Sequence, residues 1–275
     1  MALIDHLRVF RNRLGIVLLA LLVCVVVAFV FRDQVFDLIT RPYCQTGPAK
    51  EAARAAGTDQ CRLYAFSPFE QFAVSLRVSL IAGTVASAPV WIYHFGAFIT
   101  PALHRKEKRY ALGFLGSALV LFVVGTVFAY FTLARGLEFL LQVGGDGVLQ
   151  LQGIQSYLSF FTLTLLAFGI AFLFPVIVLF LNFVGVFPTR VMRSWRRGMI
   201  LGIAIAAAVL TPTSDPFTFT ALAVPLYVLY EGCIVLGRLR ERAIRRRRSA
   251  EPDAQELEQL GDDETSFIDD RPSTL

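Results

Sequence analysis

The sequence predicts an all-α, polytopic membrane protein with six transmembrane helices. Apolar residues make up 56 % of the chain and charged residues only 17 %, whereas soluble domains carry about a quarter charged residues. Six stretches lack charged side chains and are close to the length that a helix needs to cross a hydrocarbon layer about 30 Å thick. Lipid-exposed backbone must satisfy its own hydrogen bonds, and the alternating pattern of a barrel is missing, so we expect helices.

The six predicted spans follow one another along the chain and differ in length. The first four are long enough to cross a bilayer, the fifth is marginal, and the sixth reaches span length only by including Glu231 and running on to Gly237. The sequence therefore predicts that the last two spans are short. The uncharged runs cover residues 14–31, 78–100, 110–134, 147–189, 198–214 and 216–230.

Arginine and lysine are concentrated in every second connection, which sets the orientation. They precede the first span, follow the second and fourth spans, and follow the sixth. We therefore expect both termini in the cytoplasm and the chain in a bacterial cytoplasmic (inner) membrane. The net charge of +5 comes largely from these flanks and does not indicate a nucleic-acid partner.

Three segments are expected along the chain. Residues 1–13 form a cytoplasmic N-terminal segment, residues 14–237 a six-span membrane domain, and residues 238–275 a tail that is first basic and then acidic. The composition of the tail predicts disorder. Its arginine run either sets topology and attracts anionic headgroups or forms a docking surface for a partner. No cleavable signal peptide is expected, because the first apolar run is too long.

The four cysteines divide by location. Cys24 and Cys233 fall inside predicted spans, where a thiol behaves as a small hydrophobic group. Cys44 and Cys61 lie in the first external connection, which is an oxidising compartment in bacteria. They either form a disulfide or remain two unpaired thiols.

Motifs for catalysis, nucleotides or metals are missing from the sequence. The three histidines are far apart and have no Cys or Asp at ligand spacing. We therefore predict no enzyme activity, no cofactor and no metal site. Gly169 is expected to allow close helix packing.

Several short blocks along the chain form a specific pattern. Residues 6–13 read HLRVFRNR, close to an HLxELRxR pattern before a first span, and Ser67, Pro68 and Phe69 form an SPF element before the second. The other blocks are residues 88–90, 97–103, 105–109, 157–160 and 167–172, Leu210-Thr211-Pro212 with Asp215, and residues 223–225 with Glu231. In order and spacing they resemble the TatC family, the multispanning core of the twin-arginine protein translocase, from about residue 2 to residue 240.

The resemblance implies a fold and a role. Family members form a concave, glove-like cup of six helices, and two short final spans would thin the bilayer locally. The family binds folded cargo proteins that carry an Arg-Arg signal peptide. It works without catalysis or cofactor, uses the proton gradient, and assembles into a multimeric complex with single-span TatA/TatB subunits.

The resemblance also implies site residues. Acidic residues of the N-terminal segment and the first cytoplasmic loop recognise the signal, which points to Glu107; the alternative for Glu107 is a surface acid paired with neighbouring bases. Residues expected around it are His6, Leu7, Arg11, Arg13, Arg105 and Arg109. Structural positions of the family fall on Pro42, Pro68, Phe69, Pro89, Pro101, Gly169, Pro212 and Pro225.

The chain departs from the family at two acidic positions. Val9 replaces the glutamate of the HLxELRxR pattern, and Leu173 replaces a polar residue, commonly Glu, at which the family docks a partner helix. Pro175 follows and predicts a kink. His94 and Gly96 depart from the family as well. The chain is then either a divergent paralogue with impaired or altered signal recognition, or a variant in which apolar residues replaced polar ones.

Two further acids belong to the last span, one before its start and one inside it. Asp215, before Pro216, is expected to cap the sixth helix, or else to contact a partner. Glu231 lies inside the span, where an acid usually faces a bundle interior, a wet cavity or a partner helix. A small-solute secondary transporter is the less favoured alternative function, because no halves of the sequence repeat and few ionisable groups lie in the spans.

Overall fold

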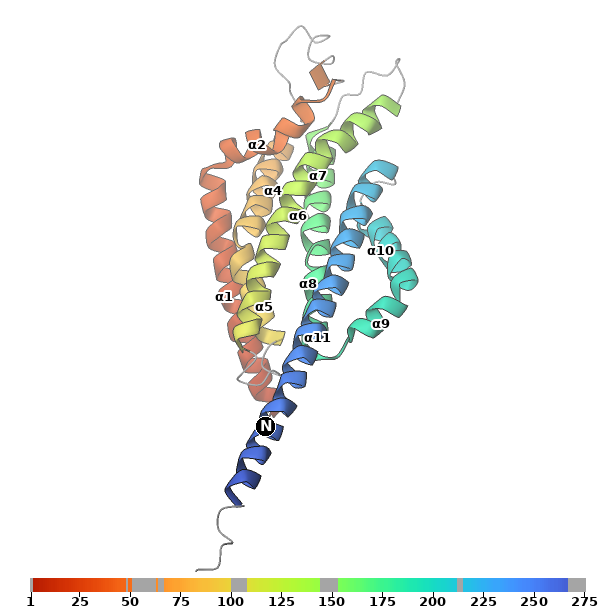
Figure 1. Ribbon diagram of the computed structural model, residues 1–275. Coiled ribbons are helices and arrows are strands. Elements are labelled where there is room, and N and C mark those ends of the chain that lie inside the picture. Colours follow the sequence, from red (N-terminus) through yellow and green to blue (C-terminus); the bar gives the residue numbers. More distant parts are fainter. Residues whose placement is uncertain are drawn as a thin grey trace, which may run out of the picture.

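The computed structural model describes residues 2–47, 49–50, 63, 67–99, 108–143, 153–211 and 215–266. The predicted all-α class is confirmed, because every regular element of this described part is a helix (Figure 1). In order they are α1 (Ala2–Val30), α2 (Arg32–Cys44), α4 (Pro68–Ala86), α5 (Ala88–Ile99), α6 (Lys108–Val143), α7 (Ile154–Ala171), α8 (Phe174–Val184), α9 (Thr189–Ser194), α10 (Arg196–Leu210) and α11 (Pro216–Ser266).

Candidate membrane spans coincide with the predicted apolar runs. Among the described residues, four stretches are long and apolar enough to cross a bilayer, within α1, within α6, across α7 and α8, and within α11. The bent pair formed by α4 and α5 raises this number to five. The remaining predicted span corresponds to α10, which has 15 residues and is short, as the sequence predicts.

The second predicted span is a broken helix. α4 and α5 meet at an angle of 52°, and Pro89 lies one residue after the start of α5. Proline lacks the N–H that would continue the helical ladder, so a bend here has a local cause. The indole Nε1 of Trp91 donates to the backbone oxygen of Thr84 at 3.2 Å. The side chain thus provides a hydrogen bond to a carbonyl group next to the bend.

The fourth predicted span is interrupted as well. α7 ends before Phe172, and α8 begins at Phe174 with Pro175 in its first turn. The proline therefore marks the interruption that the sequence predicts. α8 ends at Gly185, whose φ of 87° is a left-handed conformation that glycine adopts without steric cost.

The last helix is longer than expected. The sequence predicts a short sixth span followed by a disordered tail, whereas α11 has 51 residues. Its candidate span, Pro216–Arg246, has 31 residues and includes the first arginines of the basic segment. Extension of an existing helix avoids the cost of nucleation. The extension is also anchored, because Arg240 donates to the backbone oxygen of Asn182 at 3.3 Å. The structure thus has a helix as far as Ser266 where the sequence predicts a disordered tail, and residues 267–275 lie outside the described part.

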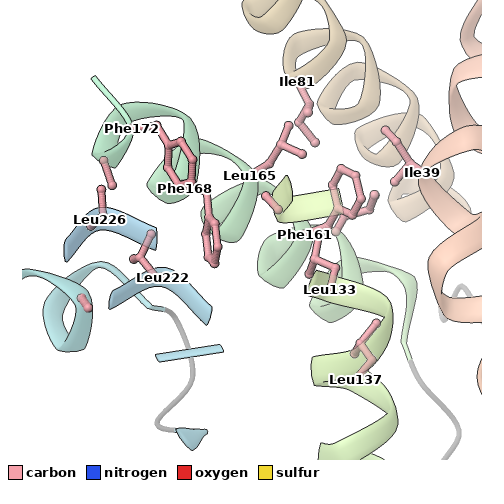
Figure 2. Close-up of a cluster of buried hydrophobic side chains, with 14 of the residues drawn as sticks. Ile39, Ile81, Leu133, Leu137, Phe161, Leu165, Phe168, Phe172, Leu222 and Leu226 are labelled. Atoms are coloured by element: carbon pink, nitrogen blue, oxygen red, sulfur yellow. The ribbon is translucent and has the colours of Figure 1, made fainter. Parts of the chain in front are cut away.

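α7 occupies the centre of the membrane domain. The α7–α8 stretch is the most buried of the candidate spans and α1 the least. Side chains from α2, α4, α6 and α11 converge on α7, as Figure 2 shows. The labelled residues of this core are Ile39, Ile81, Leu133, Leu137, Phe161, Leu165, Phe168, Phe172, Leu222 and Leu226.

Glycines let neighbouring helices approach closely. A Cβ on Gly169 would lie 2.8 Å from Cε2 of Phe122, and one on Gly125 would lie 2.9 Å from the backbone oxygen of Phe168, so α6 and α7 approach closely at both glycines. As predicted, Gly169 lies at a close contact between helices. A Cβ on Gly83 of α4 would lie 2.9 Å from the backbone nitrogen of Val25 in α1.

Tyrosines attach α2 to the membrane helices. The hydroxyl of Tyr157 donates to the backbone oxygen of Ile39 at 2.6 Å, and that of Tyr130 donates to Leu38 at 3.0 Å. Cys44, the last residue of α2, is disulfide-bonded, and Cys24 and Cys233 are free thiols. Cys61, the expected partner of Cys44, lies outside the described residues.

Gly83→Leu should destabilise the packing of α1 on α4, because the new side chain meets the backbone of Val25 and not a movable side-chain tip. Overpacking of this kind costs about 1–3 kcal/mol. We expect a lower Tm in detergent by differential scanning fluorimetry. Gly116→Leu is the matched control, since nothing lies within 4 Å of a Cβ there. Equal losses from both variants would contradict the close packing at Gly83.

Candidate functional site

One end of the molecule collects the predicted recognition elements. α1 begins, α5 ends, α6 begins and α11 ends at this end, whereas α2 and the start of α11 lie at the opposite end (Figure 1). We call it the basic end, because exposed arginines of α1 and α11 lie there, among them Arg8, Arg11 and Arg242. The N-terminal segment and the helices that flank the first basic connection therefore lie at the same end, and α1 packs against α5.

A small cavity separates α1 from α5 at the basic end. Its lining is apolar apart from one arginine and one histidine. Both polar side chains belong to the sequence features singled out above, Arg13 to the HLRVFRNR block and His94 to a departure from the family. The lining residues are Phe10, Arg13, Leu14, Val17, His94 and Phe95.

The predicted signal-binding residues are only partly described. Arg11 is exposed, as is Val9 with 43 % of its surface accessible, and Arg13 is half-buried. Glu107 and Arg105 lie outside the described residues. So do the side chains of His6, Leu7 and Arg109, whose backbones belong to α1 and α6. The structure thus places Val9 on an exposed surface of α1.

Glu231 is held within the chain. An Nη2 of Arg196, the first residue of α10, donates to its Oε2 at 2.6 Å, and the hydroxyl of Tyr227 donates to its Oε1 at 3.2 Å. Arg196 and Glu231 keep 42 % and 28 % of their side-chain surfaces exposed. The acid inside the last span is therefore neutralised by an arginine that sequence analysis had assigned only to membrane topology.

A second polar corner joins α8, α9 and α11. Nδ2 of Asn182 donates to the backbone oxygen of Phe187 at 2.9 Å and to Oγ1 of Thr189 at 3.1 Å. The guanidinium of Arg240 lies 4.1 Å from the centroid of the Phe183 ring. Sequence analysis missed this corner, because Asn182 and Arg240 are far apart in the chain and neither belongs to a recognised block.

Asp215 caps the last helix at the opposite end. Its Oδ2 accepts from the backbone N–H of Thr218 at 2.7 Å, and the side chain is buried. An N-cap bond of this type satisfies one of the free donors of the first turn. The capping role predicted from the Asp-Pro pair is therefore present. Pro216 stands at the first position of α11.

Leu173 belongs to a small apolar cluster. It is half-buried and packs against the cluster around Phe122 and Ile92, with Trp91 beside it. A glutamate at this position would put its carboxyl among those side chains. Pro175, two residues later, accepts through its carbonyl oxygen from Sγ of Cys233 at 3.3 Å, which links α8 to α11.

The remaining structural positions occupy helix ends and helix interiors. Pro68 begins α4, and the adjacent Phe69 is 86 % exposed. Pro42 is buried inside α2, and Pro225 is inside α11. Pro101 and Pro212 lie outside the described residues. Within the described part, no group of three His, Cys, Asp or Glu residues could hold a metal ion.

The ion pair between α10 and α11 should stabilise the fold. Glu231→Gln and Arg196→Gln should each lower Tm, and the double variant should lose less than the sum, with a coupling energy of about 1 kcal/mol or less because both side chains are partly exposed. Glu241→Gln, an exposed acid on the same helix, is the control and should leave Tm unchanged. Strictly additive losses would show that the pair contributes nothing.

Known proteins share this sequence over most of its length. The family described as Sec-independent protein translocase protein (TatC) matches residues 5–225. The TatC of Frankia casuarinae is 43 % identical over 98 % of this chain and 73 % of its own length. The TatC of Aquifex aeolicus is 34 % identical over 88 % of this chain and 97 % of its own.

The fold is shared too. The crystal structure of the twin-arginine translocase receptor TatC superposes with a TM-score of 0.68 and 34 % sequence identity, covering 85 % of this chain and 98 % of that one. A second crystal structure of that receptor, in DDM, gives 0.69 and covers 84 % and 99 %. Sequence and fold agree, and this chain belongs to the TatC family of Sec-independent protein translocase proteins.

Proposed function

We propose that the chain is the receptor and core subunit of a twin-arginine translocase, which binds Arg-Arg signal peptides and helps to carry folded proteins across the cytoplasmic membrane with energy from the proton gradient. The observation that carries this proposal is the agreement of sequence and fold with the TatC receptor over 85 % of the chain at 34 % identity. In this proposal the basic end faces the cytoplasm, as expected where arginine and lysine flank membrane helices.

The proposed signal site combines the start of α1 with Glu107, which belongs to the first connection of the basic end in the sequence. Glu107 directly precedes Lys108, the first residue of α6, and α6 begins at the same end as α1 (Figure 1). Exposed Arg8 and Arg11 repel a second guanidinium, so the carboxylate at position 107 is the attractive group of this site. Val9, exposed on α1, stands where the family has its second glutamate, so this chain lacks a carboxylate there.

Other acids at the basic end are poor candidates for this role. Glu231 is already paired with Arg196 and contacts Tyr227. A signal arginine would have to displace a charge-assisted bond of 2.6 Å to reach it. The side chain of Glu241 is exposed on the extension of α11 and does not belong to any of the sequence blocks that the family shares. The site therefore depends on Glu107 more than it would in a family member with both glutamates.

The partners in this proposal are single-span TatA/TatB-type subunits within a multimeric membrane complex. Leu173 offers them no hydrogen bond, whereas an interhelical polar contact in lipid contributes roughly 0.6–2 kcal/mol. Association at this position would then depend on packing against the apolar cluster of Phe122 and Trp91. A divergent paralogue with altered signal recognition is the second candidate, favoured by the apolar residues at positions 9 and 173.

Glu107→Gln should weaken the binding of an Arg-Arg signal peptide, and Val9→Glu should strengthen it by supplying a second carboxylate. Exposed ion pairs are worth about 0.2–1 kcal/mol and hydrogen bonds to charged groups about 1.5–3, so each change should shift Kd roughly fivefold. Fluorescence anisotropy with a labelled signal peptide and the full chain in nanodiscs measures this.

The matched control is Glu241→Gln, which removes one negative charge from the same end of the molecule without touching the proposed site. It should leave Kd unchanged, and a Lys-Lys peptide should bind weakly to every variant. If Kd moves neither for Glu107→Gln nor for Val9→Glu, the site proposed here is wrong.

A further inference from the structure

The cavity between α1 and α5 contains a cationic group that is not fully satisfied. Nη1 of Arg13 is buried and has no hydrogen-bond partner among the described residues. A buried donor on a charged group is costly to leave unpaired, more so than a neutral one. The walls around it are otherwise apolar, with the exception of His94. The side chain is thus placed to bind an anion that the described part of the chain does not supply.

The surroundings restrict the kind of anion. α1 is the least buried of the candidate spans, so its apolar side chains are free to face lipid. Leu14 lines the cavity, and Leu18, one turn further along α1, is 55 % exposed. The positive charge therefore lies where an exposed apolar helix face begins. A small hydrophilic anion would leave that apolar surface uncovered, whereas a phospholipid covers it with its acyl chains.

Charge at the same depth favours a negatively charged lipid over a zwitterionic one. Arg8 and Arg11 are exposed on α1 within two turns of Arg13 and add to the local positive potential. Lysine and arginine near a membrane surface attract anionic headgroups. A guanidinium binds phosphate oxygens through charge-assisted hydrogen bonds, and His94 can add a further donor from α5.

We propose that Arg13 and His94 form a binding site for the phosphate of one anionic phospholipid, whose acyl chains lie along the exposed apolar face of α1. The lipid would fill the cavity between α1 and α5 and would bind both helices at once. The family resemblance places Arg13 near the signal site, but a cationic Arg-Arg pair does not complement its guanidinium, so the lipid phosphate and the signal peptide would bind different groups, Arg13 and Glu107. Loss of signal binding would leave the proposal standing, and loss of lipid binding would leave the proposed function standing.

Native mass spectrometry of the delipidated full-length chain tests the site, with phosphatidylglycerol and phosphatidylcholine of identical acyl chains as probes. We expect phosphatidylglycerol to bind about tenfold more tightly, the effect of one hydrogen-bonded charge pair. Arg13→Gln should remove most of this preference and Arg13→Lys should keep part of it. Arg193→Gln, which removes an exposed arginine of α9, is the matched control and should keep the preference in full.

His94→Leu provides a second test if Arg13→Gln does not fold, as judged by size-exclusion chromatography and circular dichroism. It keeps every arginine and should lower the preference two- to threefold. Equal binding of the two lipids to the unmodified chain would overturn the proposal. So would an equal loss in Arg193→Gln and Arg13→Gln, since the attraction would then be diffuse. Displacement of the lipid by millimolar inorganic phosphate would also overturn it, by showing that the acyl chains do not take part.

Discussion

The close approach of α6 and α7 at Gly125 and Gly169 is the contact on which the rest of the membrane domain depends. Apolar side chains gain little from leaving lipid for a protein interior, so helices in a membrane associate through close packing and polar contacts. Here the helices approach closely at the two glycines, beside Phe122 and the backbone oxygen of Phe168. Because α7 is central, this contact sets the position of the core to which α2, α4, α6 and α11 contribute.

At the basic end, some polar groups pair with residues of other helices and others do not. Arg196 is paired with Glu231, and Arg240 donates to the backbone oxygen of Asn182, so these contacts link α10 and α8 to α11. The start of α1 differs, because Arg11 is exposed and Nη1 of Arg13 has no hydrogen-bond partner among the described residues. The corner formed by α1, α5 and the start of α6 is therefore where a signal peptide and a lipid could be recognised.

Much of the fold could be predicted from the sequence. Uncharged runs locate the helices because an apolar stretch of span length has few other stable structures. Pro175 predicts a kink from backbone chemistry alone, and Asp215 before Pro216 predicts a cap. Nothing local predicted that Arg240, at the start of the extension of α11, contacts Asn182 and Phe183, which are distant in the sequence.

The candidate site was less predictable. Glu231 can pair with Arg196 only because α10 and α11 bring the two side chains to the same height along the helix axes. The positions of the uncharged runs in the sequence do not show how the helices pack. The same holds for the cavity that joins Arg13 to His94. The missing acid at Val9 could be recognised only by comparison with the family pattern, because a valine on the surface of a membrane helix is an ordinary residue. Short sequence blocks thus predicted the family, whereas the pairing of Glu231 and the cavity at Arg13 became visible only in the structure.

The most direct measurement of the receptor function is site-specific photocrosslinking of an Arg-Arg precursor to membranes that contain only this chain and its single-span partners. A photoreactive residue next to the arginine pair of the precursor should crosslink to this chain. Replacement of the pair by Lys-Lys should abolish most of that crosslink, because a guanidinium forms bidentate bonds with a carboxylate and an ammonium does not. Equal yields for the two precursors, or no crosslink to this chain with either, would contradict a receptor role.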